Sequence, residues 1–209
     1  MDNVIGIIIS LVIFTPFALI LIWAFRYQKK VYARGWELMI DRMNSNKVSI
    51  TSLLPQNRRV KLDMAGSWSG NNIDIVNELI GQGRGRTMIT RMVVTFPKKI
   101  LPDFVLSKEN LLTRAGEKLG IKDIKTGDAE FDRVFRLTSE FDEPATLRFF
   151  DDQLIQKLKQ DQKHFMGEMI SRNNTLSVVI NSLPGYKTMQ PFFKTTFDLL
   201  IFAAGKHVS

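Results

Sequence analysis

The stretch DIKTGDAEFDRVFRL, residues 123–137, places four carboxylates close to three basic side chains. The acids are Asp123, Asp128, Glu130 and Asp132, and the bases are Lys125, Arg133 and Arg136. Such a group could bind a metal ion, supply a carboxylate pair for acid/base catalysis, or form a turn that leads into a strand. The choice decides whether the chain resembles an enzyme.

The spacing of these residues does not fit a calcium loop of the EF-hand type. That loop needs oxygen ligands at positions 1, 3, 5, 7, 9 and 12, and a glycine at position 6. Counted from Asp128, position 6 is Arg133, and positions 7, 9 and 12 are Val134, Arg136 and Ser139. The chain has no cysteine and only two isolated histidines, His164 and His207, so the sequence predicts no metal site.

Catalytic motifs give no stronger signal. Glu130 and Asp132 are two residues apart and would share one face of a strand, but nothing in the sequence predicts a pocket around them. The chain has no GxSxG motif, and the run GQGRGR at residues 81–86 fits neither a P-loop nor a dinucleotide-binding fingerprint. We interpret residues 126–128 as a turn before a strand, and we predict no catalytic residue and no cofactor. An enzyme of unfamiliar type that uses the carboxylates of residues 128–132 is the alternative.

The N-terminal segment is the clearest feature of the chain. Residues 4–25 are 22 consecutive positions without a charge. As a helix they would extend roughly 33 Å, against a hydrocarbon core of about 30 Å. A cleaved signal peptide would have a basic start and a shorter apolar run, whereas this chain starts MDN. We therefore predict a transmembrane anchor over residues 1–25, kinked at Pro16.

The flanks of this segment predict its orientation. The N-terminal side carries Asp2 and no base, whereas four bases and two aromatic residues flank the other end. These residues are Trp23, Arg26, Tyr27, Lys29, Lys30 and Arg34. Basic flanks stay in the cytoplasm and aromatic residues favour the membrane interface. The sequence therefore predicts a single-pass protein of the cell (inner) membrane, with its N-terminus outside and its C-terminal domain in the cytoplasm. The lack of cysteine is compatible with that reducing compartment.

The formal net charge of +8 suggests an acidic partner. A basic domain tethered below an anionic leaflet is attracted to lipid headgroups. Nucleic acid is not expected, because no nucleic-acid-binding motif is present. We predict that contacts with lipid or with a partner involve Arg58, Arg59, Trp68, Arg84, Arg86 and Arg91. The alternative for residues 81–86 is a plain hairpin loop, and the alternative for Trp68 is packing against the core.

The rest of the chain predicts an α+β fold. Residues 26–57 are interpreted as a juxtamembrane helix followed by a linker or a first short strand, and residues 58–209 as one mixed α+β domain. Strands are predicted at residues 58–66, 87–96, 131–139 and 175–183, and helices at residues 143–162 and 189–207. Residues 73–80 fit either a helix or a strand. The strands and helices do not alternate regularly, which argues against a doubly wound sheet.

One part of this pattern resembles a known family. The stretch TGDAEFDRVFRL is followed by an acid and a proline, the helix FFDDQLIQKLKQ and the strand TLSVVI. Upstream lie GSWSG, GRGRTMITRMVVTFP and LPDFVLSKENLL. Over residues 58–180 the chain resembles an uncharacterised bacterial family of membrane-anchored proteins with a domain of unknown function. The resemblance implies a fold and a topology, and it brings no catalytic residues.

These observations together favour a non-enzymatic role. We expect an accessory or adaptor subunit of a larger integral membrane protein complex. A sensor of anionic lipid surfaces is the second hypothesis, and the enzyme of unfamiliar type is the third.

Overall fold

The computed structural model describes residues 2–55, 62–81, 85–98, 101–108, 123–140 and 143–206. Its helices are α1 (Asp2–Ser45), α2 (Ala129–Val134), α3 (Glu143–Phe149), α4 (Asp152–Asp161) and α5 (Gln190–Gly205). Its strands are β1 (Ser49–Pro55), β2 (Leu62–Trp68), β3 (Asn71–Ile80), β4 (Thr87–Thr95), β5 (Phe104–Lys108), β6 (Asp123–Ile124), β7 (Phe135–Thr138), β8 (Glu168–Arg172) and β9 (Thr175–Ile180).

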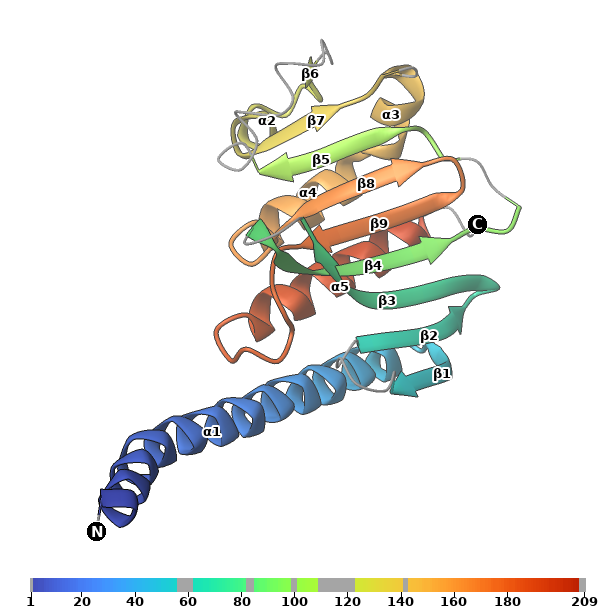
Figure 1. Cartoon of the computed structure of the whole chain (residues 1–209). Coiled ribbons are helices and arrows are strands. Elements are labelled where there is room, and N and C mark those ends of the chain that lie inside the picture. The colour runs from blue at the N-terminus through green and yellow to red at the C-terminus, as the bar shows by residue number, and fades with distance from the viewer. Residues whose placement is uncertain are drawn as a thin grey trace.

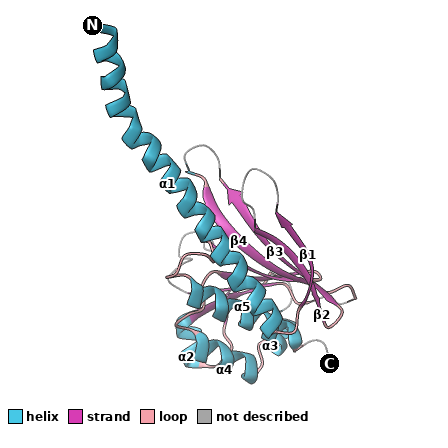
Figure 2. Ribbon diagram, turned by 90° about the horizontal axis from the view of Figure 1, so that it is seen from below, coloured by secondary structure: helices cyan, strands magenta, loops and turns pink. Residues whose placement is uncertain are grey.

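The strands form one antiparallel sheet in the order β1-β2-β3-β4-β9-β8-β5-β7-β6 (Figure 1). The helices gather on one side of this sheet, and the C-terminal part of α1 lies among them (Figure 2). This arrangement of helices on one face of an antiparallel sheet is an α+β fold, which confirms the α+β part of the predicted fold class.

The alternation of side chains along the central strands explains why one face is covered. In β3, Ile73 and Ile75 are fully buried, whereas Asp74 and Val76 on the opposite face are only half-buried. The covering helix α5 is apolar around most of its circumference, and eight of its residues are buried. A helix that is apolar around most of its circumference is stable only when other elements bury it, and here the sheet covers one side of it.

Helix α1 belongs to two environments. From Val31 to Met43 it contributes buried side chains to the core and contacts α5, β1 and β2. Its N-terminal half projects away from the domain (Figures 1 and 2). The helix is continuous through Pro16 and Gly35. The predicted juxtamembrane helix is therefore partly a core element, and the segment read as a linker or a first short strand contains β1.

Three details of the predicted elements were wrong. Residues 129–134 form the short helix α2 instead of the start of a strand, and only Phe135–Thr138 is extended. The single helix predicted at residues 143–162 is split into α3 and α4, because Asp151 between them is extended and caps α4. The predicted strand at residues 58–66 ends too early, because β2 continues through Trp68 and the turn that follows is Ser69 and Gly70.

The membrane-spanning prediction has no support from the fold itself. Among the residues that the structure describes, we find no helix with both the length and the apolar character needed to cross a membrane. The side chains of residues 2–13, which make up much of the predicted span, lie outside the described ones.

Candidate interaction surfaces

The projecting half of α1 exposes large apolar side chains. Between Phe14 and Phe25 they are half or more exposed, namely Phe14, Phe17, Leu19, Ile20, Leu21, Ile22, Trp23 and Phe25. Trp23 is 67% exposed, and its ring stacks on Tyr27 with 5.6 Å between centroids. The bases Arg26, Lys29 and Lys30 that follow are exposed as well.

The domain meets α1 at Val31, which is 2% exposed. The loop at residues 181–189 crosses the helix there with almost no clearance. A Cβ on Gly185 would lie 1.5 Å from the Val31 carbonyl oxygen, and a Cβ on Gly35 would lie 3.1 Å from the Pro184 Cγ. Only glycine at position 185 lets the two backbones approach this closely, and the contact fixes the point where α1 leaves the domain.

A polar cluster fixes the other end of α1. The Arg42 guanidinium donates two hydrogen bonds to the Asp198 carboxylate on α5, one of them from Nε over 3.2 Å. The Asn46 side-chain amide donates to the same carboxylate over 2.9 Å. With the loop contact at Val31, this cluster holds the C-terminal half of α1 rigidly against the domain.

One edge of the sheet faces the direction in which α1 leaves. Figure 2 shows the end of β3 and the start of β4 on the same side of the domain as the projecting half of α1. We call this region the exit edge and define it by its exposed residues. They are Leu53 of β1, Leu79 and Ile80 of β3, Arg86 before β4, and Tyr186 of the crossing loop.

The structure separates the predicted contact residues. Arg86 lies on the exit edge, whereas Arg91 lies farther along β4, 3.5 Å from the Glu78 carboxylate in a partly exposed ion pair. Trp68 lies at the opposite end of the sheet. Arg58, Arg59 and Arg84 lie outside the described residues. The sequence did not single out Leu79 or Ile80, because their exposure depends on how far the neighbouring strands extend.

Trp68 is partly buried against the core and lines a groove on the helical side of the sheet. Its ring lies against α5, since a Cβ on Gly205 would be 3.2 Å from the indole. The other lining residues include Ile201 and Phe202 of α5 and the bases Lys157 and Lys206. The groove therefore combines apolar side chains with polar ones: the Asp198 carboxylate also lines it, and the two lysines pair with Asp161 and Asp151 of the same domain.

The carboxylates of residues 128–132 are all engaged in local bonds. Asp128 caps α2 by accepting from the backbone N–H groups of Phe131 and Glu130, over 2.9 and 3.0 Å. The Lys159 ammonium on α4 lies 2.9 Å from both the Asp128 and the Glu130 carboxylates. Asp132 accepts from the backbone and the hydroxyl of Thr126, over 3.0 and 2.9 Å.

These bonds perturb the pKa of Asp128. The hydrogen bond from the Phe131 N–H, together with the bond from Lys159, lowers the pKa of this carboxyl below its ordinary value. A lowered pKa favours the charged, hydrogen-bonded form. The cluster thus fastens α2 to α4. Among the described residues, no group of three acids, histidines or cysteines lies close enough to hold a metal ion.

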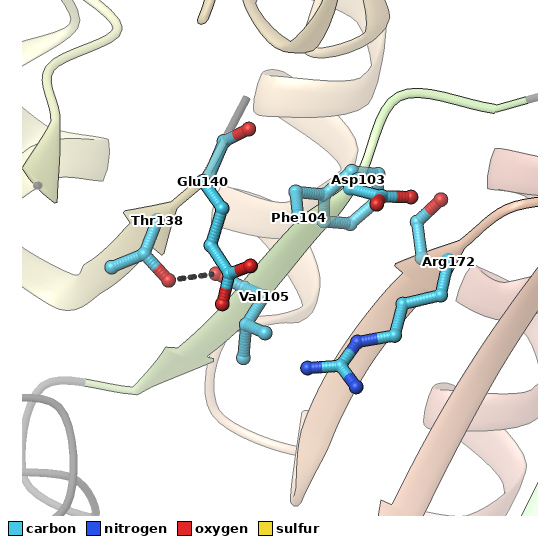
Figure 3. Close-up of a pocket in the computed structure, with 8 residues that line it drawn as sticks. Asp103, Phe104, Val105, Thr138, Glu140 and Arg172 are labelled. Carbon is cyan, nitrogen blue, oxygen red and sulfur yellow. Dashed lines mark hydrogen bonds between the residues drawn. The ribbon is translucent and has the colours of Figure 1, made fainter. Parts of the chain in front are cut away.

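A second, small cavity of about 40 Å³ opens where β5 begins and where β7 and β8 end (Figure 3). The Glu140 carboxylate and the Arg172 guanidinium both extend along its sides, while Asp103 accepts from the Asn173 N–H over 3.0 Å. Inside, the Thr138 hydroxyl donates to the Val105 carbonyl over 3.4 Å. Charges of both signs could bind a small polar group. The sequence did not predict this cavity, because its residues meet only through the strand pairing.

Comparison with known proteins gives a fold relationship. No protein-family model matches the chain, and no curated protein sequence matches it. Among solved structures, the fold is similar to the crystal structure of the mycobacterial trehalose monomycolate transport factor A, TtfA. The match has a TM-score of 0.50 and 13% sequence identity, and it covers 85% of this chain and 95% of that chain. At this identity the similarity shows a shared fold and no more.

Proposed function

We propose that the chain is a non-enzymatic, single-pass membrane protein that serves as an accessory or adaptor subunit of an integral membrane protein complex. The observation that carries this proposal is the divided environment of α1. Its C-terminal half is built into the core, whereas its N-terminal half exposes apolar side chains from Phe14 to Phe25 and projects from the domain.

An exposed apolar helix of this length is unfavourable in water. Contiguous apolar surface of that kind normally marks a membrane or protein contact. The segment of 22 uncharged residues that includes it is long enough for the hydrocarbon core, and the bases Arg26, Lys29 and Lys30 follow directly. The basic flank favours a cytoplasmic domain and an N-terminus on the other side.

Two features support the accessory role of the domain. The carboxylates of residues 128–132 form local bonds, including ion pairs that join α2 to α4, so they have a structural role in the fold. The Trp68 groove offers an amphipathic surface at the end of the sheet opposite to the exit edge. TtfA, the fold neighbour, is by name a transport factor, and an accessory role in membrane transport fits this arrangement.

The anchor is tested by replacing Ile20 and Leu21, which are exposed on α1, with aspartate. A charge costs about 2.5–3.5 kcal/mol at the centre of a spanning helix and less toward its ends, so we expect the double variant to leave the membrane fraction at alkaline pH more readily than wild type. The matched control replaces exposed Lys29 and Lys30 with glutamine. If the aspartate variant stays in the membrane as firmly as wild type, the spanning helix is refuted.

The adaptor role is tested at Trp68. When full-length Trp68→Ala and wild type are isolated in mild detergent, we expect the variant to recover several-fold less of the accompanying membrane proteins. The control variant is Phe14→Ala, which removes an aromatic side chain from the projecting half of α1. Equal recovery of accompanying proteins with Trp68→Ala would remove the groove from the proposal. Substrate turnover that disappears with Glu130→Gln would instead favour an enzyme.

A further inference from the structure

The hairpin formed by β3 and β4 reaches the exit edge. Its pairing runs from Asn72 and Thr95 as far as Ile80 and Thr87. The neighbour β9 pairs with β4 between Thr90 and Thr95, so residues 87–89 lie beyond the end of β9. Residues 78–80 and 87–89 pair with each other there, and we call them the β3–β4 tip.

The tip carries exposed aliphatic side chains at the end of a hairpin, where charged residues are more common. Leu79 is 46% exposed and Ile80 is 43% exposed, and the nearby Leu53 on β1 is 43% exposed. Natural sheets usually protect such exposed ends with charged residues. Exposed aliphatic residues here indicate a surface that is covered when the protein functions.

Charge and position indicate what covers it. Arg86 is exposed directly beside the tip, and Arg84 is two residues away in the sequence. The tip points in the direction in which α1 leaves the domain (Figure 2), and the exposed bases Arg26, Lys29 and Lys30 lie on that part of α1. Aliphatic residues beside an exposed arginine match the boundary between acyl chains and anionic headgroups.

We propose that the β3–β4 tip is a second membrane contact. Leu79 and Ile80 insert into the interfacial layer of an anionic bilayer, and Arg86 binds the headgroups beside them. This inference rests on the proposed anchoring of α1. Because Val31, Gly35 and the Gly185 loop fix α1 on the domain, the two contacts together would set the orientation of the whole domain on the membrane.

The chain has no cysteine, so single-cysteine labelling tests this contact directly. Full-length Ile80→Cys is labelled with an environment-sensitive fluorophore and placed in phosphatidylcholine vesicles with 30% phosphatidylglycerol. Lys98→Cys, an exposed position just past the opposite end of β4, is the matched control. We expect lipid-bound quenchers to quench the label at position 80 at least fivefold more than at position 98. Aqueous iodide should show the reverse order.

A second variant tests the role of charge. Arg86→Glu in the Ile80→Cys background should reduce the lipid quenching at position 80 at least twofold, and 0.5 M salt should reduce it in the unmodified tip. A label at position 80 that iodide reaches as easily as at position 98 overturns the proposal. So does a label protected from both quenchers, which would mean that protein covers the tip.

Flotation of the same vesicles separates this proposal from the anchor. If the protein fails to float with the vesicles, the spanning helix is wrong. If it floats while position 80 stays in water, the anchor stands and the tip contact is wrong.

Discussion

At the scale of single residues, the acidic stretch illustrates how charged side chains can serve structure. Asp128 accepts two backbone N–H groups at the start of α2 and an ammonium from α4. A short helix of six residues has little intrinsic stability, so its cap and this cross-link determine whether it forms. The density of acids in the sequence therefore reflects the anchoring of α2.

We expect Asp128→Ala to lower the melting temperature of the full-length protein by roughly 2–4 °C, because both the cap and the Lys159 bond are lost. Asp128→Asn keeps a capping oxygen and loses only the charge, so its effect should be smaller. Thermal unfolding in detergent measures both. Equal stability of wild type and Asp128→Ala would contradict the structural role.

The pH dependence of this site has a defined sign. The folded-state pKa of Asp128 is lowered from the ordinary value of 3.8, so its stabilising effect is present above that value and is lost as pH falls through the lowered pKa. The difference in melting temperature between wild type and Asp128→Asn should therefore be full at pH 7 and fade below about pH 4. A difference that grows in acid would contradict the assignment.

The glycine pair where α1 leaves the domain makes a second residue-scale prediction. Gly185→Ala places a Cβ against the Val31 carbonyl, and backbone there has to move, so we expect a loss of about 2 kcal/mol or more in unfolding free energy. Gly35→Ala is the matched control. It meets neighbours at 3.1 Å but gains about 1 kcal/mol of helix propensity, so its effect should be small. If denaturant unfolding gave a larger loss of unfolding free energy for Gly35→Ala than for Gly185→Ala, this contact would be refuted.

At the scale of elements, α1 is the feature that connects the two proposed surfaces. Its core half supplies Met39 and Met43 to the hydrophobic interior, and Arg42 binds α5 through Asp198. Because both ends of this half are fixed, a force on the projecting half would be transmitted to the sheet instead of being absorbed by a linker.

We expect Asp198→Ala to lower the unfolding free energy by about 1–2 kcal/mol, because the half-buried Arg42 and the Asn46 amide lose their shared acceptor. The comparison variant is Asp161→Ala, which breaks the more exposed Lys157 pair on α4 and should cost about 0.3–0.5 kcal/mol. Chemical denaturation of both variants provides the test. Similar losses for the two would show that the bond does not fasten α1.

The sequence predicted elements well where one signal dominated. The alternation in residues 87–96 correctly predicted β4, and the apolar residues of 189–207 correctly predicted α5. The sequence of residues 73–80 fitted either a helix or a strand. In the structure these residues belong to a strand, because β2 and β4 pair with it on its two sides. The break between α3 and α4 was missed, since Asp151 caps α4 while the apolar spacing continues through it.

Surfaces were harder to predict than elements. Arg86, predicted as a contact residue, is exposed, whereas the sequence did not single out Leu79 and Ile80, because their exposure depends on how the strands pair. Trp68 could not be assigned to core or partner from its glycine and serine neighbours. Its place beside Gly205 depends on contact between β2 and a helix more than 130 residues later in the chain.

At the scale of the whole molecule, we propose a basic domain that is held at a membrane by one helix and oriented by the β3–β4 tip. In this arrangement the Trp68 groove lies at the end of the sheet away from the exit edge, where a partner could reach it.

The most direct test of the central claim is the size and composition of the full-length protein extracted gently from its native membrane. The account predicts that the 24.0 kDa chain elutes in a larger particle, together with a fixed-ratio set of integral membrane proteins. Elution of the chain alone in its own detergent micelle, with nothing at constant ratio, would contradict an accessory subunit.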